Sequence, residues 1–464
     1  MISAFDETVC APATAVGTGA ISIIRVSGPD ALVVADRVLR LRNGSVQDAP
    51  GYSLKFGTVE DGGATLDEVL VAVFRAPHSY TGEDGVEIYC HASPFIVERT
   101  LQLLVSAGCR MAGPGEFTRR AFVHGRMDLA QAESVADLIG ASSAAAQRVA
   151  MHQLKGDYSR ELRVLRDELV RIVSLMELEL DFSEEDVTFA DRSRLETLLR
   201  ESLRHIDALA GSFRTGNAIK NGVPVAIVGA VNSGKSTLLN ALVGEQRAIV
   251  SDVPGTTRDT VEECVTLGGV LLRFIDTAGL RSRAGRIEKI GIARTYEKIE
   301  QALIVLCVLD ATRPDEVLVH EAARVAERMD QLQQRLILLL NKSDEAPGRP
   351  VPSGLPAGPV LAISARTGAG LEALRSALAD AAGLGFGADA GLGSSMVTNL
   401  RHYEALTHAG DALRRDLDGL AGGISTELLT QDLREAIREL GSIFGEITTD
   451  EILGSIFERF CIGK

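Results

Sequence analysis

The sequence predicts a multidomain α/β protein, in which a doubly wound α/β domain is inserted into a helical bundle that follows an α+β segment. Five continuous apolar runs alternate with helical stretches between about residues 217 and 383, as parallel strands covered on both faces do. Stretches with helical periodicity lie on both sides of that region, at about 127–212 and 396–464. The expected segments are residues 1–122, 123–215, 216–383 and 384–464.

The N-terminal segment mixes strands with a helix. A buried strand is expected at 69–74, and residues 86–91 alternate apolar and polar side chains as a half-buried strand does. A helix is expected from Pro94 to about Gly108. The next segment carries apolar residues at spacings of four and three, which predicts one long helix with a single packing face. These residues are Leu154, Tyr158, Leu162, Leu165, Leu169, Ile172 and Met176.

Composition argues against several classes of protein. None of the six cysteines forms a CxxC pair, so neither a zinc ribbon nor a disulfide framework is expected. The chain does not start like a signal peptide and has no apolar run long enough to span a membrane, so we expect a soluble, cytoplasmic protein without a membrane partner. The net charge of −15 argues against nonspecific coating of nucleic acid, although a basic run lies between Arg281 and Lys298.

A phosphate-binding loop is predicted at residues 229–236, GAVNSGKS, because its glycines let backbone N–H groups wrap the phosphates of a nucleotide. Lys235 would reach the β- and γ-phosphates, and the Ser236 hydroxyl would bind Mg²⁺. A predicted strand precedes the loop and a predicted helix follows it, which is the setting this motif requires. The nucleotide-binding residues expected here are Asn232, Ser233, Gly234, Lys235, Ser236 and Thr237.

Three further motifs follow in an order that chance does not explain. DTAG ends a strand, where Asp276 would hold Mg²⁺ through water and the Gly279 N–H would meet the γ-phosphate. NKSD also ends a strand, and the Asp344 carboxylate can accept the N1–H and the amine of guanine, a pair that adenine lacks. SAR, residues 364–366, would close over the base. The residues expected to bind GTP in these motifs are Asp276, Thr277, Ala278, Gly279, Asn341, Lys342, Ser343, Asp344, Ser364, Ala365 and Arg366.

The segment before DTAG has to supply a hydroxyl to Mg²⁺ and a backbone N–H to the γ-phosphate. Within GTTRD, Thr257 is the expected magnesium ligand and Thr256 its competitor. Leu280 follows DTAG, where Ras-type GTPases place a glutamine that orients the attacking water. Leucine cannot do this, so another group must position the water. Glu288 is the nearest carboxylate downstream, although its spacing alone favours a solvated helix face.

The chain resembles the tRNA uridine-modifying GTPases of the TrmE/MnmE type over essentially its whole length. The resemblance rests on GAVNSGKSTLLN, AIVSDVPGTTRD, DTAGL followed by RIEKIGIAR, SYTGEDGVEI, PGEFTRRAF with MDLAQAESVADLI, and the terminal FCIGK. It implies an N-terminal folate-binding domain, a central helical domain and an inserted G domain. It also implies that the protein acts with a flavin-dependent partner to install an aminomethyl or carboxymethylaminomethyl group on C5 of the tRNA wobble uridine. A folate would supply the one-carbon unit.

The resemblance further implies a homodimer formed through the N-terminal domain, with the two G domains meeting across a K⁺ ion. The partner carries FAD, and the two proteins would form a heterotetramer. Asn232 matches the asparagine that ligates K⁺, Ser251, Val253 and Thr256 match positions that complete the cation site, and Glu288 matches the catalytic glutamate. The loop residues that match GTP-contacting positions are Ser251, Asp252, Val253, Pro254, Gly255, Thr256 and Thr257.

Four residues match folate-contacting positions of the family: Arg25, Glu87, Arg126 and Lys464. Glu87 suits a pterin, whose adjacent N–H donors fit a carboxylate, and the arginines suit acceptor and carboxylate groups of the folate. The implied cofactor is 5-formyl- or methylene-tetrahydrofolate. Cys461 matches the family's C-terminal cysteine near that pocket, and its role stays open.

Three other interpretations compete with this one. A ribosome-assembly GTPase would carry a basic RNA-binding module beside its G domain, and neither flank is strongly basic. A folate-dependent one-carbon enzyme with a regulatory GTPase domain would transfer the one-carbon unit without a flavoprotein. A GTP-gated scaffold without chemistry of its own is partly compatible with the main interpretation.

Overall fold

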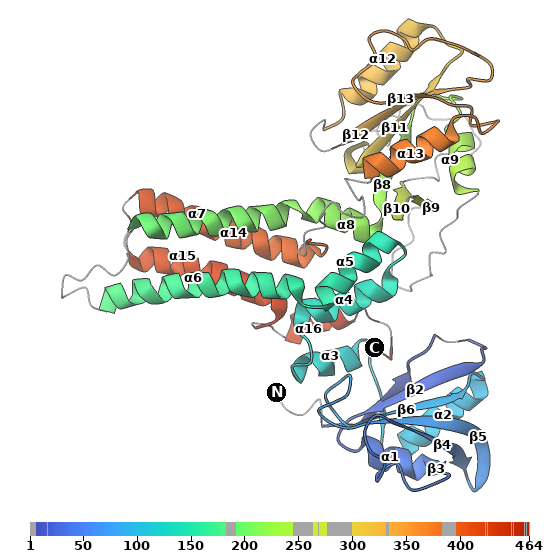
Figure 1. The fold of residues 1–464 in the computed structure, drawn as a ribbon, viewed down its shortest axis with the longest axis vertical. Coiled ribbons are helices and arrows are strands. Elements are labelled where there is room, and N and C mark those ends of the chain that lie inside the picture. Colours follow the sequence, from blue (N-terminus) through green and yellow to red (C-terminus); the bar gives the residue numbers. More distant parts are fainter. Residues whose placement is uncertain are drawn as a thin grey trace. The chain divides into compact units, whose positions relative to one another are not determined.

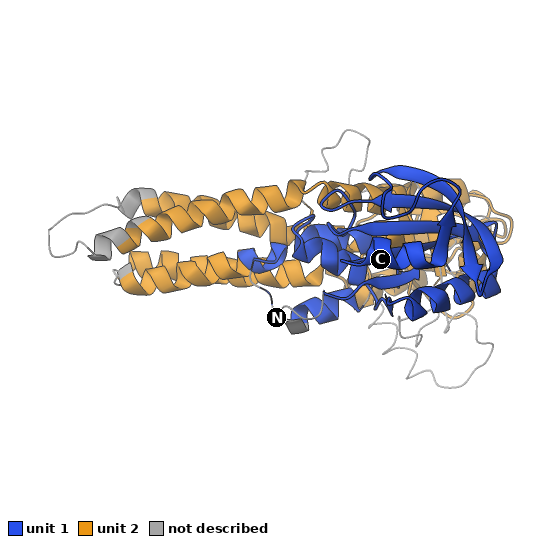
Figure 2. Cartoon of the chain, turned by 90° about the horizontal axis from the view of Figure 1, so that it is seen from below, with its two compact units in different colours: residues 1–136, 441–464 blue, residues 137–440 orange. Residues whose placement is uncertain are grey.

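A computed structural model shows a multidomain protein that divides into two compact units, residues 1–136 with 441–464, and residues 137–440 (Figure 2). The described residues are 6–15, 17–181, 192–244, 263–267, 269–275, 299–330, 334–382, 396–422, 426–446 and 450–458, with Ile424, Thr448, Phe460, Ile462 and Gly463.

The first unit is built on a seven-stranded sheet whose strand order is β3-β4-β5-β6-β2-β1-β7 (Figure 1). All neighbouring strands pair antiparallel except β1 and β7, which are parallel. The strands are β1 (Val9–Pro12), β2 (Ile21–Ser27), β3 (Leu39–Leu41), β4 (Ser53–Asp61), β5 (Ala64–Phe74), β6 (Gly85–His91) and β7 (Arg110–Met111). The helices are α1 (Ala31–Val38), α2 (Pro94–Ser106), α3 (Glu116–Val123), α16 (Asp450–Phe457) and α4 (Leu129–Gly140), the last of which crosses into the second unit.

The two faces of this sheet differ. Helices α1 and α2 pack against one face and close a core that contains Ile24, Val71 and Ile88. On β6 the burial alternates as the sequence predicts, and α2 confirms the predicted helix after it. Strand β5 contains the predicted strand at 69–74 and begins five residues earlier, at Ala64. On β4, Leu54 and Phe56 are 59% and 44% exposed, so part of the sheet is left uncovered.

Four long helices of the second unit run side by side: α6 (Asp157–Asp181), α7 (Arg192–Gly211), α14 (Leu400–Ala421) and α15 (Thr426–Phe444), the last of which ends in the first unit (Figure 1). Helices α7 and α14 pack together although the whole α/β region lies between them in the sequence. Arg414 of α14 donates to Asp207 of α7 at 2.5 Å, and Arg434 of α15 donates to Glu177 of α6 at 2.5 Å. The helices on either side of the α/β region therefore pack as one bundle.

The prediction of one long helix from Leu154 to Met176 was wrong at its start. Leu154 ends α5 (Ala144–Leu154), and α6 begins three residues later. Between them Gly156 adopts φ 80°, a left-handed conformation that ends an α-helix. From Tyr158 onward the predicted stripe is buried along α6, as expected for a packing face.

The α/β region contains a six-stranded sheet of order β13-β12-β11-β8-β10-β9. Its strands are β8 (Val223–Val228), β9 (Glu263–Leu267), β10 (Val270–Phe274), β11 (Ile304–Asp310), β12 (Arg335–Asn341) and β13 (Val360–Ala362). The five predicted apolar runs all form parallel strands, whereas β9 pairs antiparallel with β10 and was not predicted. Helix α8 (Phe213–Asn221) leads into this sheet.

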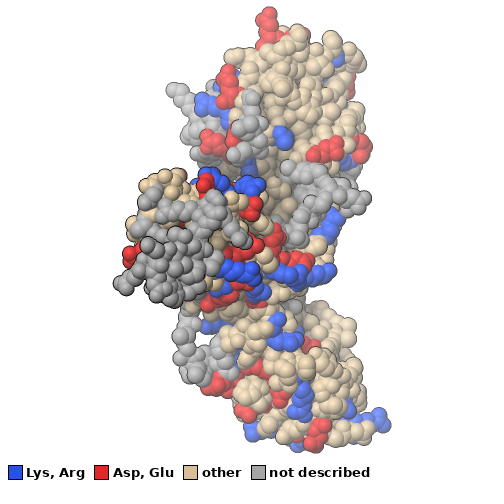
Figure 3. Space-filling view, turned by 60° about the vertical axis from the view of Figure 1, so that its left-hand side comes forward, with Lys and Arg blue, Asp and Glu red and all other residues tan. Residues whose placement is uncertain are grey.

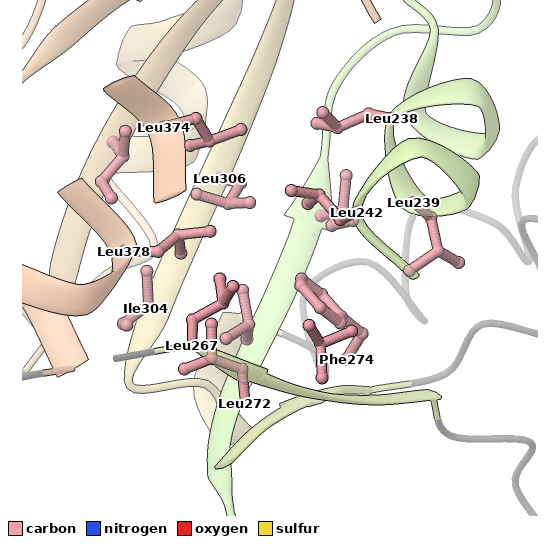
Figure 4. Close-up of a cluster of buried hydrophobic side chains, with 14 of the residues drawn as sticks. Leu238, Leu239, Leu242, Leu267, Leu272, Phe274, Ile304, Leu306, Leu374 and Leu378 are labelled. Carbon is pink, nitrogen blue, oxygen red and sulfur yellow. The ribbon is translucent and has the colours of Figure 1, made fainter. Parts of the chain in front are cut away.

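Helices cover both faces of this sheet, as its apolar strands require. Helices α9 (Lys235–Val243) and α13 (Leu371–Ala382) pack on one face, where Leu242, Leu306 and Leu378 meet (Figure 4). Helix α12 (Asp315–Ala326) packs on the other face. Every residue of β11 is buried, which explains why the sequence of this strand does not alternate between apolar and polar residues.

No helix among the described residues is both long and apolar enough to cross a membrane. Lys and Arg side chains are interspersed with Asp and Glu on the face shown in Figure 3. The basic run between Arg281 and Lys298 lies outside the described residues.

Candidate functional site

The phosphate-binding loop leaves the buried strand β8 and enters α9, as the motif requires. Gly234 precedes the helix with φ 99°, and a Cβ there would lie 2.1 Å from Nδ2 of Asn341. A Cβ at Gly229 would lie 2.2 Å from the carbonyl oxygen of Val308 on β11. Both glycines are therefore required by close packing, Gly229 against the backbone of Val308 and Gly234 against the side chain of Asn341, independently of any bound phosphate.

Lys235 folds back over this loop. Its Nζ donates to the carbonyl oxygens of Gly229 at 2.9 Å and Ala230 at 2.6 Å. These acceptors are neutral, so an anionic phosphate would compete for the ammonium with a stronger, charge-assisted interaction. The ammonium therefore already lies over the loop that would hold the phosphates.

Three predicted polar residues of the loop are exposed. Asn232 adopts φ 65°, an uncommon conformation that asparagine tolerates better than most residues. Its side chain is exposed, and so are those of Ser236 and Thr237 in the first turn of α9. Because the N-terminus of a helix carries unsatisfied N–H groups and partial positive charge, this end of α9 suits an anion with its counter-cation.

Asn341 joins the phosphate-binding loop to the SAR motif. Its Nδ2 donates to the carbonyl oxygen of Ser233 at 2.7 Å, and its Oδ1 accepts from the Ala365 N–H at 3.0 Å. Both ends of this buried amide are thus used inside the protein. The first residue of NKSD therefore holds the backbone of the phosphate-binding loop against the SAR motif.

Asp344 lies beside the SAR motif. Arg366 donates from Nη2 to its Oδ2 at 2.6 Å. The Ser364 hydroxyl and then the Arg366 guanidinium lower the pKa of Asp344, against the opposite effect of desolvation. The carboxylate is therefore ionised at neutral pH, which is the form that accepts the two donors of guanine.

Asp310, the last residue of β11, was not predicted as a site residue from the sequence. Its Oδ2 lies 2.6 Å from Nζ of Lys342, the second residue of NKSD. A signal was present, because an acidic residue that ends a buried parallel strand lies at the sheet edge where α/β proteins bind ligands.

Several predicted site residues lie outside the described part of the chain. They are Ser251, Asp252, Val253, Pro254, Gly255, Thr256, Thr257, Asp276, Thr277, Ala278, Gly279 and Glu288, with Cys461 and Lys464 at the C-terminus. Their roles stay predictions.

In the first unit, the structure pairs two of the predicted folate residues with each other. Arg25 on β2 lies directly opposite Glu87 on β6, and its Nε and Nη2 donate to Glu87 Oε1 at 3.0 and 2.8 Å. The Tyr89 hydroxyl donates to the other carboxylate oxygen of Glu87 at 3.1 Å. Both side chains are mostly buried, so this ion pair is less screened than a surface pair.

Two aromatic rings and the C-terminal tail complete the surroundings of Arg25. Its guanidinium carbon lies 5.2 Å from the ring centroid of Tyr80 and 5.5 Å from that of Phe117. Its Nη1 donates to the carbonyl oxygen of Gly463 at 3.4 Å. The sequence analysis missed both rings, although Tyr80 lies in SYTGED and Phe117 in PGEFTRRAF.

Arg126 follows α3 and is exposed. Its side chain lies beside the SYTGED loop, since a Cβ built at Gly82 would lie 3.4 Å from Arg126 Cγ. No described contact joins Arg126 directly to Arg25 or Glu87.

The same two motifs form a buried charge network. Arg120, which is fully buried, donates to Glu83 and to Glu116 at 2.9 Å each. Burial of Glu116 acts to raise its pKa, but hydrogen bonds from Arg110, the Gly113 N–H and Arg120 bring that pKa down to about 2. The network ties α3 to the SYTGED loop, which explains why these motifs carry so many charges.

Comparison with known proteins gives consistent results over the whole chain. The family model described as the MnmE helical domain matches residues 129–461, and the model described as the GTP-binding protein TrmE N-terminus matches residues 8–126. A tRNA modification GTPase MnmE from Parabacteroides distasonis is 47% identical over 99% of this chain and 100% of its own length. The protein of the same name from Bacteroides thetaiotaomicron is 48% identical, with the same coverage.

Among solved structures, the G domain of the T. maritima FeoB iron transporter is 30% identical, covering 34% of this chain and 98% of its own length, with a TM-score of 0.26. The family assignment depends instead on the full-length relatives and the two family models. Together with a phosphate-binding loop, an NKSD motif and an SAR motif that meet at one edge of a parallel sheet, they lead to one conclusion. The chain belongs to the MnmE (TrmE) family of tRNA modification GTPases.

Proposed function

We propose that this GTPase is stimulated by K⁺ and forms 5-carboxymethylaminomethyl or aminomethyl uridine at the tRNA wobble position. It would act with a flavin-dependent, FAD-carrying partner protein and take the one-carbon unit from 5-formyl- or methylene-tetrahydrofolate. The relatives are named tRNA modification GTPases, which supports the substrate class. Described residues also support the proposed ion sites, folate site and subunit contact, each in its own way.

The described loop residues fit the ions that GTP hydrolysis would need. Ser236, exposed in the first turn of α9, offers a hydroxyl where Mg²⁺ would lie against the β- and γ-phosphates. The exposed amide oxygen of Asn232 is a hard oxygen donor of the kind that K⁺ accepts. A K⁺ ion beside the phosphates would neutralise charge as an arginine does in other GTPases.

One observation carries the folate proposal, namely that the C-terminal tail meets Arg25. Arg25 donates to Gly463, and Ile462 forms a β-bridge with Pro114. Gly463 and Ile462 therefore hold the described end of the tail beside the Arg25 and Glu87 pair. A carboxylate, a guanidinium and aromatic rings in one part of the fold suit a pterin, which combines N–H donors with a flat ring.

The proposed homodimer would use the uncovered face of the N-terminal sheet. Phe56 of β4 pairs directly with Leu70 of β5, and Leu54 lies two residues from Phe56 on the same face. All three are exposed, at 59% for Leu54, 44% for Phe56 and 43% for Leu70. Adjacent exposed apolar side chains of this kind are typical of a protein interface. We place the protein, its partner and the tRNA in the cytoplasm.

The test is nucleoside mass spectrometry of tRNA from cells that lack the gene and carry it back on a plasmid. The parent protein should restore the modified wobble uridine, whereas Glu87→Gln should restore little. Glu60→Gln, which alters an exposed ion pair with Arg40, is the matched control and should restore fully. Unchanged nucleosides in cells without the gene would refute the proposal and favour a ribosome-assembly GTPase.

Two narrower outcomes would correct parts of the proposal. Equal GTP turnover of the purified protein in Na⁺ and K⁺ would remove the role of K⁺. Restoration by Glu87→Gln at the parent level would remove Glu87 from the folate site while leaving the tRNA function in place.

A further inference from the structure

Lys342 is held by a carboxylate from the neighbouring strand. Strands β11 and β12 are parallel, and Asp310 lies opposite Asn341 at their shared end. The next residue, Lys342, adopts φ 66°, and its Nζ lies 2.6 Å from Asp310 Oδ2. The other oxygen, Oδ1, accepts from the hydroxyl and the N–H of Thr312 at 2.7 and 3.1 Å. Both oxygens of Asp310 are therefore engaged, and its orientation is fixed.

This ion pair differs from a surface ion pair. The Asp310 side chain is 11% exposed and that of Lys342 is 28% exposed. Burial acts to raise the pKa of Asp310, but the hydrogen bonds from Lys342 and Thr312 lower it below its usual value. The carboxylate is thus ionised at neutral pH and holds the ammonium with little competition from water.

The anchored lysine lies inside the motif that would read the base. Asn341, on one side of it, binds the phosphate loop through Ser233. Asp344, two residues on, carries the ionised carboxylate beside the SAR motif. Lys342 therefore lies between the two ends of the expected nucleotide site, with its charge neutralised and much of its stem covered.

We propose that Asp310 is a positioning residue for guanine nucleotides, which acts by holding Lys342 in one conformation as a wall of the base pocket. The proposal rests on the assignment of Lys342 to the GTP site. A free lysine side chain samples many rotamers and loses that freedom when a ligand packs against it. Asp310 orders the side chain before the nucleotide arrives, so binding avoids that entropic cost.

The expected loss of GDP affinity follows from the conformational entropy of the lysine side chain. Because ordering a lysine costs about 1–2 kcal/mol and 1.4 kcal/mol corresponds to a factor of ten, Asp310→Ala should weaken GDP binding about tenfold. Most of the loss should be faster dissociation. The turnover number at saturating GTP should stay within about twofold, because the neutralised ammonium is assigned to the base and not to the phosphates.

The experiment measures equilibrium binding and dissociation of a fluorescent GDP analogue by the full-length protein. The variants are Asp310→Ala, Asp310→Asn, Lys342→Ala and the Asp310→Ala/Lys342→Ala double variant. Asp310→Asn keeps an acceptor and should lie between the parent and Asp310→Ala. Because Asp310 acts through Lys342, the double variant should bind GDP no more weakly than Lys342→Ala alone.

A matched control separates positioning from folding. Thr312→Val removes a hydroxyl bond to the same carboxylate but leaves the ion pair, so GDP dissociation should change less than twofold. Melting curves of all variants report any loss of fold, and Asp310→Asn keeps the test valid if Asp310→Ala does not fold.

Two outcomes would overturn the positioning role of Asp310. One is unchanged GDP affinity in Asp310→Ala. The other is a loss of affinity in the double variant equal to the product of the losses in the two single variants. Unchanged affinity in Lys342→Ala would instead remove Lys342 from the GTP site, and the proposal with it.

Discussion

The two polar sites of this chain are built in opposite ways. The nucleotide site of the second unit is assembled from short local motifs, in which Gly229 and Gly234 allow close packing and the Asn341 side chain bonds backbone groups of two motifs. The folate site proposed in the first unit is made of side chains from distant segments, since Arg25 and the Gly463 carbonyl that it binds are 438 positions apart. A site of the first kind is visible as a local motif, and a site of the second kind becomes visible only after folding.

The sites also differ in how their charges are satisfied. In the first unit, cations bind carboxylates, as Arg25 binds Glu87 and Arg120 binds Glu83 and Glu116. In the phosphate loop, Lys235 donates to the carbonyl oxygens of Gly229 and Ala230. A phosphate would displace these neutral acceptors, whereas a folate would have to compete with an ion pair.

The largest expected effect tests the phosphate loop. Lys235→Ala should lower kcat/KM for GTP by about a thousandfold, because a preorganised cation at the transferring phosphate typically contributes that much. The melting temperature of the variant reports whether the fold is kept. GTP turnover with a range of substrate concentrations is the measurement, and Lys155→Ala, on an exposed turn, is the control. Turnover within tenfold of the parent would remove Lys235 from the phosphate site.

The next effect tests the paired charges of the first unit. Arg120→Met leaves Glu83 and Glu116 without their buried partner and should cost about 3–4 kcal/mol of local stability. Arg110→Met alters a partly exposed pair to Glu116 and should cost less than about 1 kcal/mol. Hydrogen exchange of residues 79–91, followed by mass spectrometry, reports the loss. Equal exchange in the two variants would mean that burial of Arg120 adds nothing to the network.

A third effect concerns a buried carboxyl that neither site uses. Asp416 of α14 is fully buried, and neither of its oxygens has a hydrogen-bond partner among the described residues. Burial and the neighbouring Asp432 raise the pKa of Asp416 to about 8, while Arg415 acts in the other direction. The folded protein therefore keeps this carboxyl protonated at neutral pH. The mostly buried carboxylates of the first unit are instead paired with arginines.

The pH dependence follows from the direction of that shift. Below an unfolded pKa of about 4, folded and unfolded chains both hold the proton, and the stability is fully present. As pH rises toward 8 only the unfolded chain releases it, so stability should fall with a slope approaching about 1.4 kcal/mol per pH unit. Asp416→Asn should flatten the profile between pH 5 and 8, whereas Asp411→Asn, an exposed residue of the same helix, should leave it unchanged. Equal slopes for the parent and Asp416→Asn in urea denaturation would show that Asp416 is not the group responsible.

The same contrast explains what could be predicted from the sequence. The parallel strands and the phosphate loop were predicted because their signals are local: apolar runs, glycines and a lysine at fixed spacing. Strand β9 was missed because its sequence, ECVTL, is not a continuous apolar run. Its formation depends on pairing with the antiparallel strand β10. The break at Gly156 was missed because the apolar spacing continues across it and only φ distinguishes the two helices. Asp310 was missed because its partner, Lys342, lies on another strand end.

The smallest expected effect tests whether the ion pair between Arg366 and Asp344 competes with the nucleotide. Arg366 donates a hydrogen bond to Asp344 in the place where the N1–H and the amine of guanine would donate. The nucleotide therefore has to displace Arg366 from this carboxylate. The Arg366 side chain is 71% exposed and such a pair is weak, so Arg366→Ala should tighten GDP binding by no more than about fivefold. The gain should be smaller for IDP, whose base lacks the amine. Binding of fluorescent GDP with IDP as competitor measures both, and Arg328→Ala, away from the motif, serves as the control. Weaker GDP binding in Arg366→Ala would mean instead that Arg366 contacts the bound nucleotide and leaves Asp344 when GTP arrives.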